Sequence, residues 1–137
     1  MGREMNNRAR GRERGFTLIS MMVVISIMLI LLGVAMPIYS HSVTRAKEQN
    51  LRRNLDTLNR LIYQYTMDKQ KYPKSLEDLH SGGYLDKIPP DINGAEWQTE
   101  AADGTIMSLE QTDPDGIIGV HSGSNGTASD GTAYSSW

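Results

Sequence analysis

The chain has 137 residues, no cysteine and a formal net charge of −2. This length accommodates one small domain with an extension, and the lack of cysteine excludes disulfide bonds and cysteine-based zinc or thiol chemistry. Residues 75–137 carry eleven Asp or Glu against Lys87 alone, which argues against nucleic-acid binding there and leaves room for a hard cation such as calcium.

Residues 1–15 form a basic leader with five Arg against two Glu, and residues 16–36 follow without a single charge. About 20 apolar residues span a bilayer core as a helix, so we expect a transmembrane helix over residues 16–37. The arginines of the leader favour a cytoplasmic N-terminus. A buried helix of a soluble protein is the alternative, and it is disfavoured because the remaining chain has too few apolar residues to cover such a segment.

Residues 38–71 are predicted to continue as an amphipathic helix, although Gly33 and Pro37 should weaken or kink it. Five apolar residues recur there at helical spacing, which predicts one stripe packed on the protein's own head domain; they are Leu51, Leu55, Leu58, Ile62 and Tyr65. A free coiled coil is the lesser alternative, since the pattern covers only about two heptads. The dipeptide Tyr72-Pro73 should end the helix.

Residues 72–137 are predicted to form a small head. A short helix should start at Ser75 and stop at Gly82-Gly83. Three strands should follow, over residues 96–101, 105–111 and 116–122, with a tight hairpin at Asp103-Gly104 between the first two. The expected fold is therefore α+β, a long N-terminal helix with a membrane half and an amphipathic half, carrying a small three-stranded antiparallel sheet.

The start of the apolar run resembles the signal of type IV pilin-like proteins, the pilins and pseudopilins. The residues that carry this resemblance are Arg14-Gly15, Phe16-Thr17-Leu18-Ile19 and Pro37. The head is similar to that of the major pseudopilins of type II secretion systems, through Tyr72-Pro73, Leu76, Leu79, Gly83-Tyr84-Leu85, Pro90-Asp91, Gly94 and Trp97.

The resemblance implies that a prepilin peptidase cuts between Gly15 and Phe16 and methylates the new amine of Phe16. The mature chain would be a single-pass protein of the bacterial inner membrane, in contact with membrane lipid, with its N-terminus in the cytoplasm and its head in the periplasm. A platform protein and an assembly ATPase would stack it with other pseudopilins, as a homo- or hetero-polymer. The resulting pseudopilus would help to drive folded proteins through a secretin.

The assembly residues implied by the resemblance are Phe16, Ser20 and Pro37, and Ser20 departs from the family. The fifth mature position usually holds Glu, whose carboxylate offsets the buried N-terminal ammonium of a neighbouring subunit. Three interpretations follow: a minor or tip subunit, assembly by packing alone or beside Glu-bearing partners, or avoidance of the cost of placing an acid in the membrane. The head motifs favour assembly with partners.

The resemblance also implies a calcium site in the loop of residues 121–132, with Asn125 and Asp130 as ligands. The alternative is a plain solvated loop, because one carboxylate and one amide are a weak ligand set unless carbonyls complete it. No catalytic residue is predicted, since His41, His80 and His121 lack nucleophiles or metal ligands at a recognisable spacing. The chain is therefore not expected to be an enzyme.

Two other functions stay open. A type IV pilin for adhesion, motility or DNA uptake would share the N-terminal signal, but its head usually carries a cysteine pair, and a DNA-binding head should be basic. A signal-anchored periplasmic binding module or enzyme is the third possibility, and it would not need the Gly15-Phe16 junction.

Overall fold

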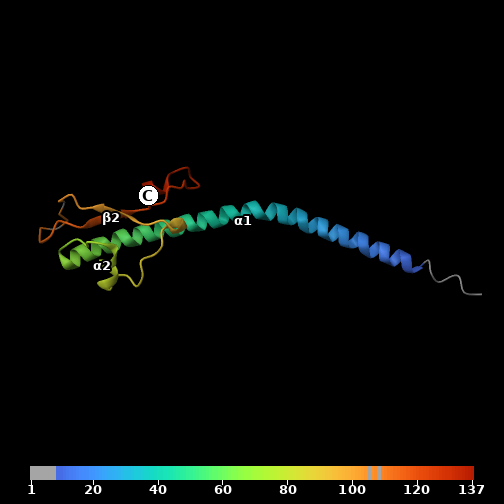
Figure 1. The fold of residues 1–137 in the computed structure, drawn as a ribbon, viewed down its shortest axis with the longest axis horizontal. Coiled ribbons are helices and arrows are strands. Elements are labelled where there is room, and N and C mark those ends of the chain that lie inside the picture. Colours follow the sequence, from blue (N-terminus) through green and yellow to red (C-terminus); the bar gives the residue numbers. More distant parts are fainter. Residues whose placement is uncertain (1–8, 105, 108) are drawn as a thin grey trace, which may run out of the picture. The chain divides into compact units, whose positions relative to one another are not determined.

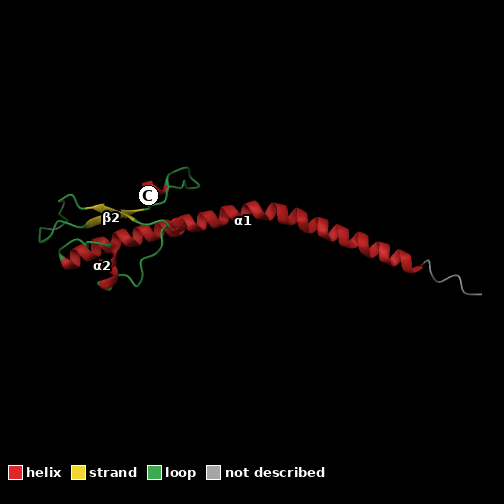
Figure 2. Cartoon of the chain, viewed as in Figure 1, coloured by secondary structure: helices red, strands yellow, loops and turns green. Residues whose placement is uncertain are grey.

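The computed structural model describes residues 9–104, 106–107 and 109–137, with side chains described from Phe16 onward. The chain divides into two units, Met1–Val43 and Thr44–Trp137. The elements in chain order are the helices α1 (Ala9–Lys69) and α2 (Leu76–Ser81), the short 3-10 helix η1 (Ile92–Gly94), the strands β1 (Gln98–Ala101) and β2 (Ile117–His121), and the 3-10 helix η2 (Tyr134–Ser136) (Figures 1 and 2). The first eight residues of the predicted leader lie outside the described residues.

The apolar run is helical throughout, as predicted, and Pro37 lies inside α1. Hydroxyl groups in the run and just beyond it bond back to carbonyls of the same helix: Ser26 Oγ donates to Met22 O at 2.7 Å, and Ser42 Oγ donates to Ile38 O at 3.0 Å. A hydroxyl that is satisfied within its own helix does not need water. These serines therefore do not prevent the helix from lying in an apolar environment.

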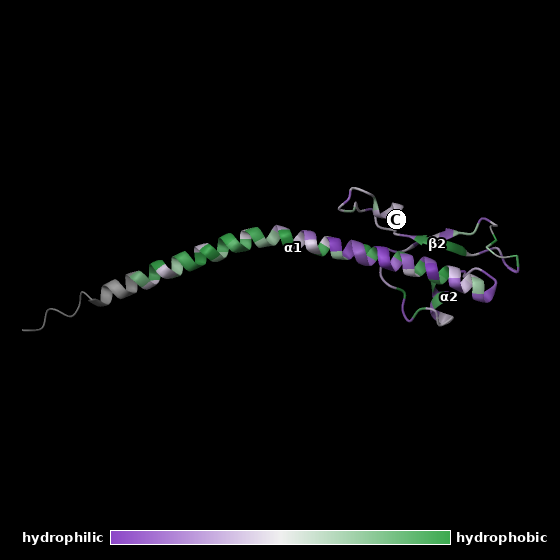
Figure 3. Cartoon of the chain, turned by 180° about the vertical axis from the view of Figure 1, so that it is seen from behind, coloured by the Kyte–Doolittle hydropathy of each residue, from purple (hydrophilic) through white to green (hydrophobic). Residues whose placement is uncertain are grey.

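The amphipathic stripe is confirmed. Leu51, Leu55, Leu58, Ile62 and Tyr65 are all buried, and Leu58 and Ile62 have no exposed surface. Figure 3 shows the change in α1 from a hydrophobic N-terminal part to a largely hydrophilic C-terminal part. The stripe forms a single core within Thr44–Trp137 together with residues from α2, η1, β2, η2 and one loop, namely Leu76, Leu79, Ile92, Ile117, Val120, Ala128 and Tyr134.

The sheet has two strands in the described part of the chain, not three. β1 and β2 pair antiparallel with Gln98 opposite His121 and Ala101 opposite Ile117, and a bulge follows Glu100. The predicted strand over residues 105–111 is wrong for its described residues, none of which is in a strand, while Thr105 and Ser108 lie outside the description. The predicted tight hairpin at Asp103-Gly104 is wrong as well, since β1 pairs with β2 and no described residue between Ala101 and Ile117 belongs to a strand.

The connection follows a different course because its backbone binds the end of α1. Thr112 N donates to the carbonyl of Gln70 at 2.9 Å, which satisfies a carbonyl just past the end of the helix. Lys74 Nζ holds the same connection through Asp113 Oδ2 at 2.9 Å and Asp115 O at 2.8 Å. The apolar residues that suggested a strand are exposed, with Leu109 at 98%, so they contribute nothing to the core.

The short helix α2 begins directly after Ser75 and ends at Ser81, directly before Gly82, as predicted. Its N-terminus is stabilised differently, because the Ser75 side chain makes no capping bond. The carboxylate of Asp78 instead accepts from Lys74 N at 2.7 Å. Gly83 has φ +79° and lets the chain reverse, so that Tyr84 N reaches Leu79 O. The helix places Leu76 and Leu79 in the core.

Candidate functional site

The apolar part of α1 is exposed along its whole described length. Phe16 is 77% exposed, and large apolar side chains from Leu18 to Tyr39 share this exposure. Among the described residues, α1 is the one helix long and apolar enough to cross a membrane, judged by length and composition, and none of its most apolar window is buried. Such a surface is stable only in lipid or against other apolar helices.

The predicted processing and assembly residues all lie on this helix. Gly15 and Phe16 are successive helical residues, Ser20 is exposed one turn further on, and Pro37 lies within the helix. Ser20 therefore stands on a surface that a neighbouring helix or lipid would cover. Its hydroxyl cannot neutralise an ammonium group as a carboxylate would.

In the unit Thr44–Trp137, a buried carboxylate fastens the end of β2. Asp91 is 4% exposed and accepts hydrogen bonds from Ser122 Oγ to both of its oxygens at 2.9 Å, from Gly123 N at 2.8 Å and from Ile92 N at 2.6 Å. Donors on three residues thus satisfy a charge that would be costly to bury alone. The Pro90-Asp91 motif marks this residue in the sequence, where its role was not predicted.

A second buried carboxylate holds residues 122–137, called here the C-terminal segment, against α1. Glu48 is 7% exposed and accepts from Ser129 N at 2.7 Å, from Ser129 Oγ at 2.5 Å and from Tyr134 Oη at 3.1 Å. The hydrogen bonds from Ser129 lower the pKa of Glu48 below its usual 4.5. Burial, together with the hydrogen bond to Glu48, raises the pKa of Tyr134.

The two expected calcium ligands are both exposed in this segment. Asp130 Oδ1 accepts from Thr132 Oγ1 at 2.6 Å and from Thr132 N at 3.0 Å, and Asp130 Oδ2 accepts from Arg52 at 3.0 Å. No group of three or more His, Cys, Asp or Glu that could hold a metal ion occurs among the described residues. In this arrangement Asn125 and Asp130 do not fit a calcium ligand set, and calcium binding stays a prediction.

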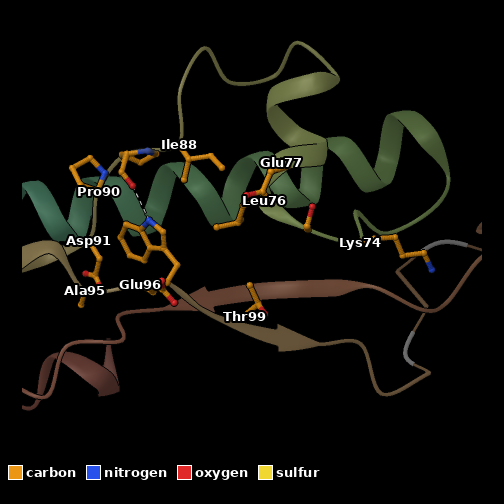
Figure 4. Close-up of a pocket in the computed structure, with 12 residues that line it drawn as sticks. Lys74, Leu76, Glu77, Ile88, Pro90, Asp91, Ala95, Glu96 and Thr99 are labelled. Atoms are coloured by element: carbon orange, nitrogen blue, oxygen red, sulfur yellow. Dashed lines mark hydrogen bonds between the residues drawn. The ribbon is translucent and has the colours of Figure 1, made fainter.

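A cleft of about 520 Å³ in this unit lies between α2, the loop of residues 88–91 and β1 (Figure 4). Trp97 Nε1 donates to Pro89 O at 2.7 Å beside it. Two of the three histidines are bound to backbone carbonyls, His80 to Leu85 O and His121 to Trp137 O. The cleft lining contains no histidine and no serine paired with one, so it offers no recognisable catalytic set.

Comparison with known proteins agrees with the geometry of α1. Residues 10–36 match the family described as the prokaryotic N-terminal methylation motif. The chain is 31% identical over 74 residues to competence protein ComGC of Halalkalibacterium halodurans, covering 54% of this chain and 72% of that protein. The chain belongs to the pseudopilin family.

Two further relatives of this pseudopilin are named type II secretion system core protein G. The identity is 28% over 103 residues to that of Klebsiella pneumoniae, covering 64% of this chain and 74% of the relative. It is 26% over 130 residues to that of Escherichia coli K12, covering 82% and 90%. No solved structure gives a significant match. These relatives are structural proteins and not enzymes, and the family together with the apolar helix indicates a membrane-anchored pseudopilin.

The residues that sequence reasoning missed in this pseudopilin are those that bind the C-terminal segment. No role was predicted from the sequence for Glu48 or Arg52. A usable signal was present, because Glu48 lies three residues before Leu51, on the side of the helix that carries the stripe. A charged side chain on that side of the helix faces the head, so it needs polar partners there.

Proposed function

We propose that this chain is a structural subunit of the type II secretion pseudopilus. It would be processed by prepilin peptidase between Gly15 and Phe16, methylated at the amine of Phe16, and assembled from the inner membrane to help drive export through a secretin. One observation carries the proposal: an exposed, uncharged stretch of α1 begins at Phe16, directly after a basic leader, within the methylation motif of residues 10–36. A plain signal anchor would not need that junction.

The exposed helix also explains how the subunits would hold together. Once withdrawn from lipid, such helices bury their apolar surface only against one another, at roughly 25 cal/mol per Å² of apolar surface removed from water. The units formed by residues 44–137 would then cover the outside of the polymer. This role requires binding and no catalytic group.

The proposed placement follows the charge of the leader. Five arginines in residues 1–15 favour a cytoplasmic N-terminus by the positive-inside rule, which would leave the head in the periplasm. The proposed partners are prepilin peptidase, the platform protein with its assembly ATPase, and other pseudopilins. Because Ser20 lacks a carboxylate, we propose that partners bearing Glu at this position support its assembly.

The test is the intact mass of the chain isolated from a native membrane that contains its peptidase. The expected product begins at Phe16 and carries one additional methyl group at its amine. A chain that retains residues 1–15 in that membrane would refute processing and reduce the apolar helix to an anchor. Deletion of the gene should then abolish protein export if the chain belongs to a secretion machine.

A competence pilus is the second candidate, and the similarity to ComGC favours it. The acidic head counts against direct contact with DNA, because phosphate binding needs Lys and Arg. Measurement of transformation and of protein export in the same deletion strain separates the two functions. Loss of transformation with export unchanged would select the competence role.

A further inference from the structure

Two residues of α1, one helical turn apart, hold most of the C-terminal segment. Glu48 accepts its three hydrogen bonds from Ser129 and Tyr134. Arg52 lies four residues further on and so on the same side of the helix. We call Glu48 and Arg52 the anchor pair. It reaches across 78 to 86 residues of sequence to bind the segment.

The Arg52 guanidinium lies between a carboxylate and an aromatic ring. Its Nη2 donates to Asp130 Oδ2 at 3.0 Å, and its Cζ lies 4.1 Å from the centre of the Trp137 ring. Trp137 Nε1 donates to Thr132 Oγ1 at 2.7 Å, and the Trp137 ring meets the Tyr134 ring edge-on at 5.4 Å. One positive group thus joins a carboxylate, a tryptophan and, through both of them, Thr132.

This arrangement occupies the place where a metal ion would have to bind Asp130. Both oxygens of Asp130 already accept hydrogen bonds, from Thr132 and from Arg52. The adjoining cleft of about 230 Å³ is lined by Arg45, Glu48, Gln49, Arg52, Ser129 and Asp130. A divalent cation entering it would meet two arginines beside the carboxylates of Glu48 and Asp130, and both carboxylates already have partners. Arg52 would have to leave Asp130 before the ion could bind there.

We propose that Arg52 supplies the positive charge that a bound cation would otherwise supply to the C-terminal segment, so that the anchor pair holds this segment without calcium. How much Arg52 and Glu48 each stabilise the segment follows from the burial of their side chains. Arg52 and Asp130 have side chains 60% and 47% exposed, and an exposed ion pair contributes little by itself. Glu48 is buried and fully bonded, so it carries most of the stabilisation. The proposal concerns the head alone and does not depend on which machine uses the pseudopilin.

The first test uses the full-length wild-type chain in detergent. Its thermal unfolding is followed by the fluorescence of Trp97 and Trp137, once in a calcium chelator and once in about 1 mM free calcium, which would fill a site of ordinary affinity. The expected Tm is the same in both, within about 2 °C. A calcium site filled 100-fold above its Kd would instead raise Tm by about 10 °C or more, and that result would overturn the proposal.

The second test compares variants of the anchor pair with matched surface variants. Glu48→Gln should lower Tm by about 5–10 °C, equally in chelator and in calcium. Arg52→Gln should lower it by a few degrees and change the emission of Trp137, because the ring loses the guanidinium above it. The controls are Glu77→Gln on α2 and Arg53→Gln on α1, both exposed residues expected to leave Tm unchanged.

Each result decides the matter. A Tm for Glu48→Gln equal to that of Glu77→Gln would remove the anchor role of Glu48. A loss of stability in Glu48→Gln that calcium restores would assign the role to an ion. The wild-type comparison needs no variant, so it decides the metal question even if Glu48→Gln fails to fold.

Discussion

Replacement of Gly123 by alanine should be among the most damaging single changes in the head, although Gly123 is only partly buried. A Cβ added at this position would lie 2.0 Å from the carbonyl oxygen of Glu96. Carbon and oxygen atoms without a bond between them need more than 3 Å, so the two backbone segments must separate by about 1 Å. The clash cannot be relieved by rotating a side chain, because the contacting oxygen belongs to the backbone of Glu96.

The cost follows from what this separation breaks. Gly123 N donates to Asp91 Oδ2 at 2.8 Å, and the neighbouring Ser122 Oγ bonds both oxygens of the same carboxylate. Hydrogen bonds to a charged group are worth about 1.5–3 kcal/mol each, and a buried carboxylate that loses them costs more. We expect a loss of about 3–5 kcal/mol in the free energy of unfolding. For a unit of this size it lowers Tm by at least about 12 °C.

The assay is thermal unfolding of the full chain in detergent, read by tryptophan fluorescence. The matched control is Gly104→Asn, because no described atom lies within 4 Å of a Cβ there and asparagine tolerates the positive φ of +68°. This control should lower Tm by less than about 5 °C. Equal Tm values for the two variants would refute the reasoning from the Glu96 contact.

The other predictions concern the core, the anchor pair and the junction. Leu58→Ala removes a side chain with no exposed surface and should cost about 2–5 kcal/mol in urea unfolding, whereas Thr57→Ala on the same helix should cost less than about 1 kcal/mol. Folding lowers the pKa of Glu48, so the stabilisation by Glu48 is complete above the ordinary pKa of 4.5 and is lost as the pH falls through and below that value. Between pH 7 and pH 3, the Tm of Glu48→Gln should therefore fall less than the Tm of the wild type. Parallel curves of Tm against pH would contradict this. Gly15→Leu should leave the precursor uncut on an immunoblot, while Gly11→Leu in the same leader should be processed normally. Ser20→Glu should increase filaments of this chain alone several-fold in a pelleting assay, because a carboxylate can pair with the buried amine of Phe16; no increase would remove the charge argument for Ser20.

The helices could be predicted from sequence because their signals are local and strong. The uncharged run has membrane length, and the stripe from Leu51 to Tyr65 repeats with the period of a helix, so both were confirmed without knowledge of the partner surfaces. Ser75 and Gly82 correctly bounded α2. The strands at Gln98–Ala101 and Ile117–His121 were also found close to their predicted positions.

The sequence alone could not exclude the third strand, because Ile106, Met107 and Leu109 are apolar residues that also occur in strands. The backbone takes another course because of a long-range contact, the hydrogen bonds from Thr112 to the carbonyl of Gln70. The partners of the anchor pair could not be predicted for the same reason. Nothing near Glu48 in the sequence indicates that Ser129 and Tyr134, more than 80 residues away, are its partners. Interactions of this kind depend on the finished fold.

The span of these contacts also sets the order in which the head closes. Glu48 and Arg52 leave the ribosome long before Ser129 and Tyr134, and the apolar stripe that starts at Leu51 emerges with them. Contacts between distant parts of a chain form slowly, because the entropy cost of closing a long loop comes before the contacts stabilise it. The stripe therefore stays uncovered through most of the synthesis of the head, next to a segment already suited to lipid. During that interval we expect the nascent chain to be open to binding by chaperones that recognise exposed apolar segments.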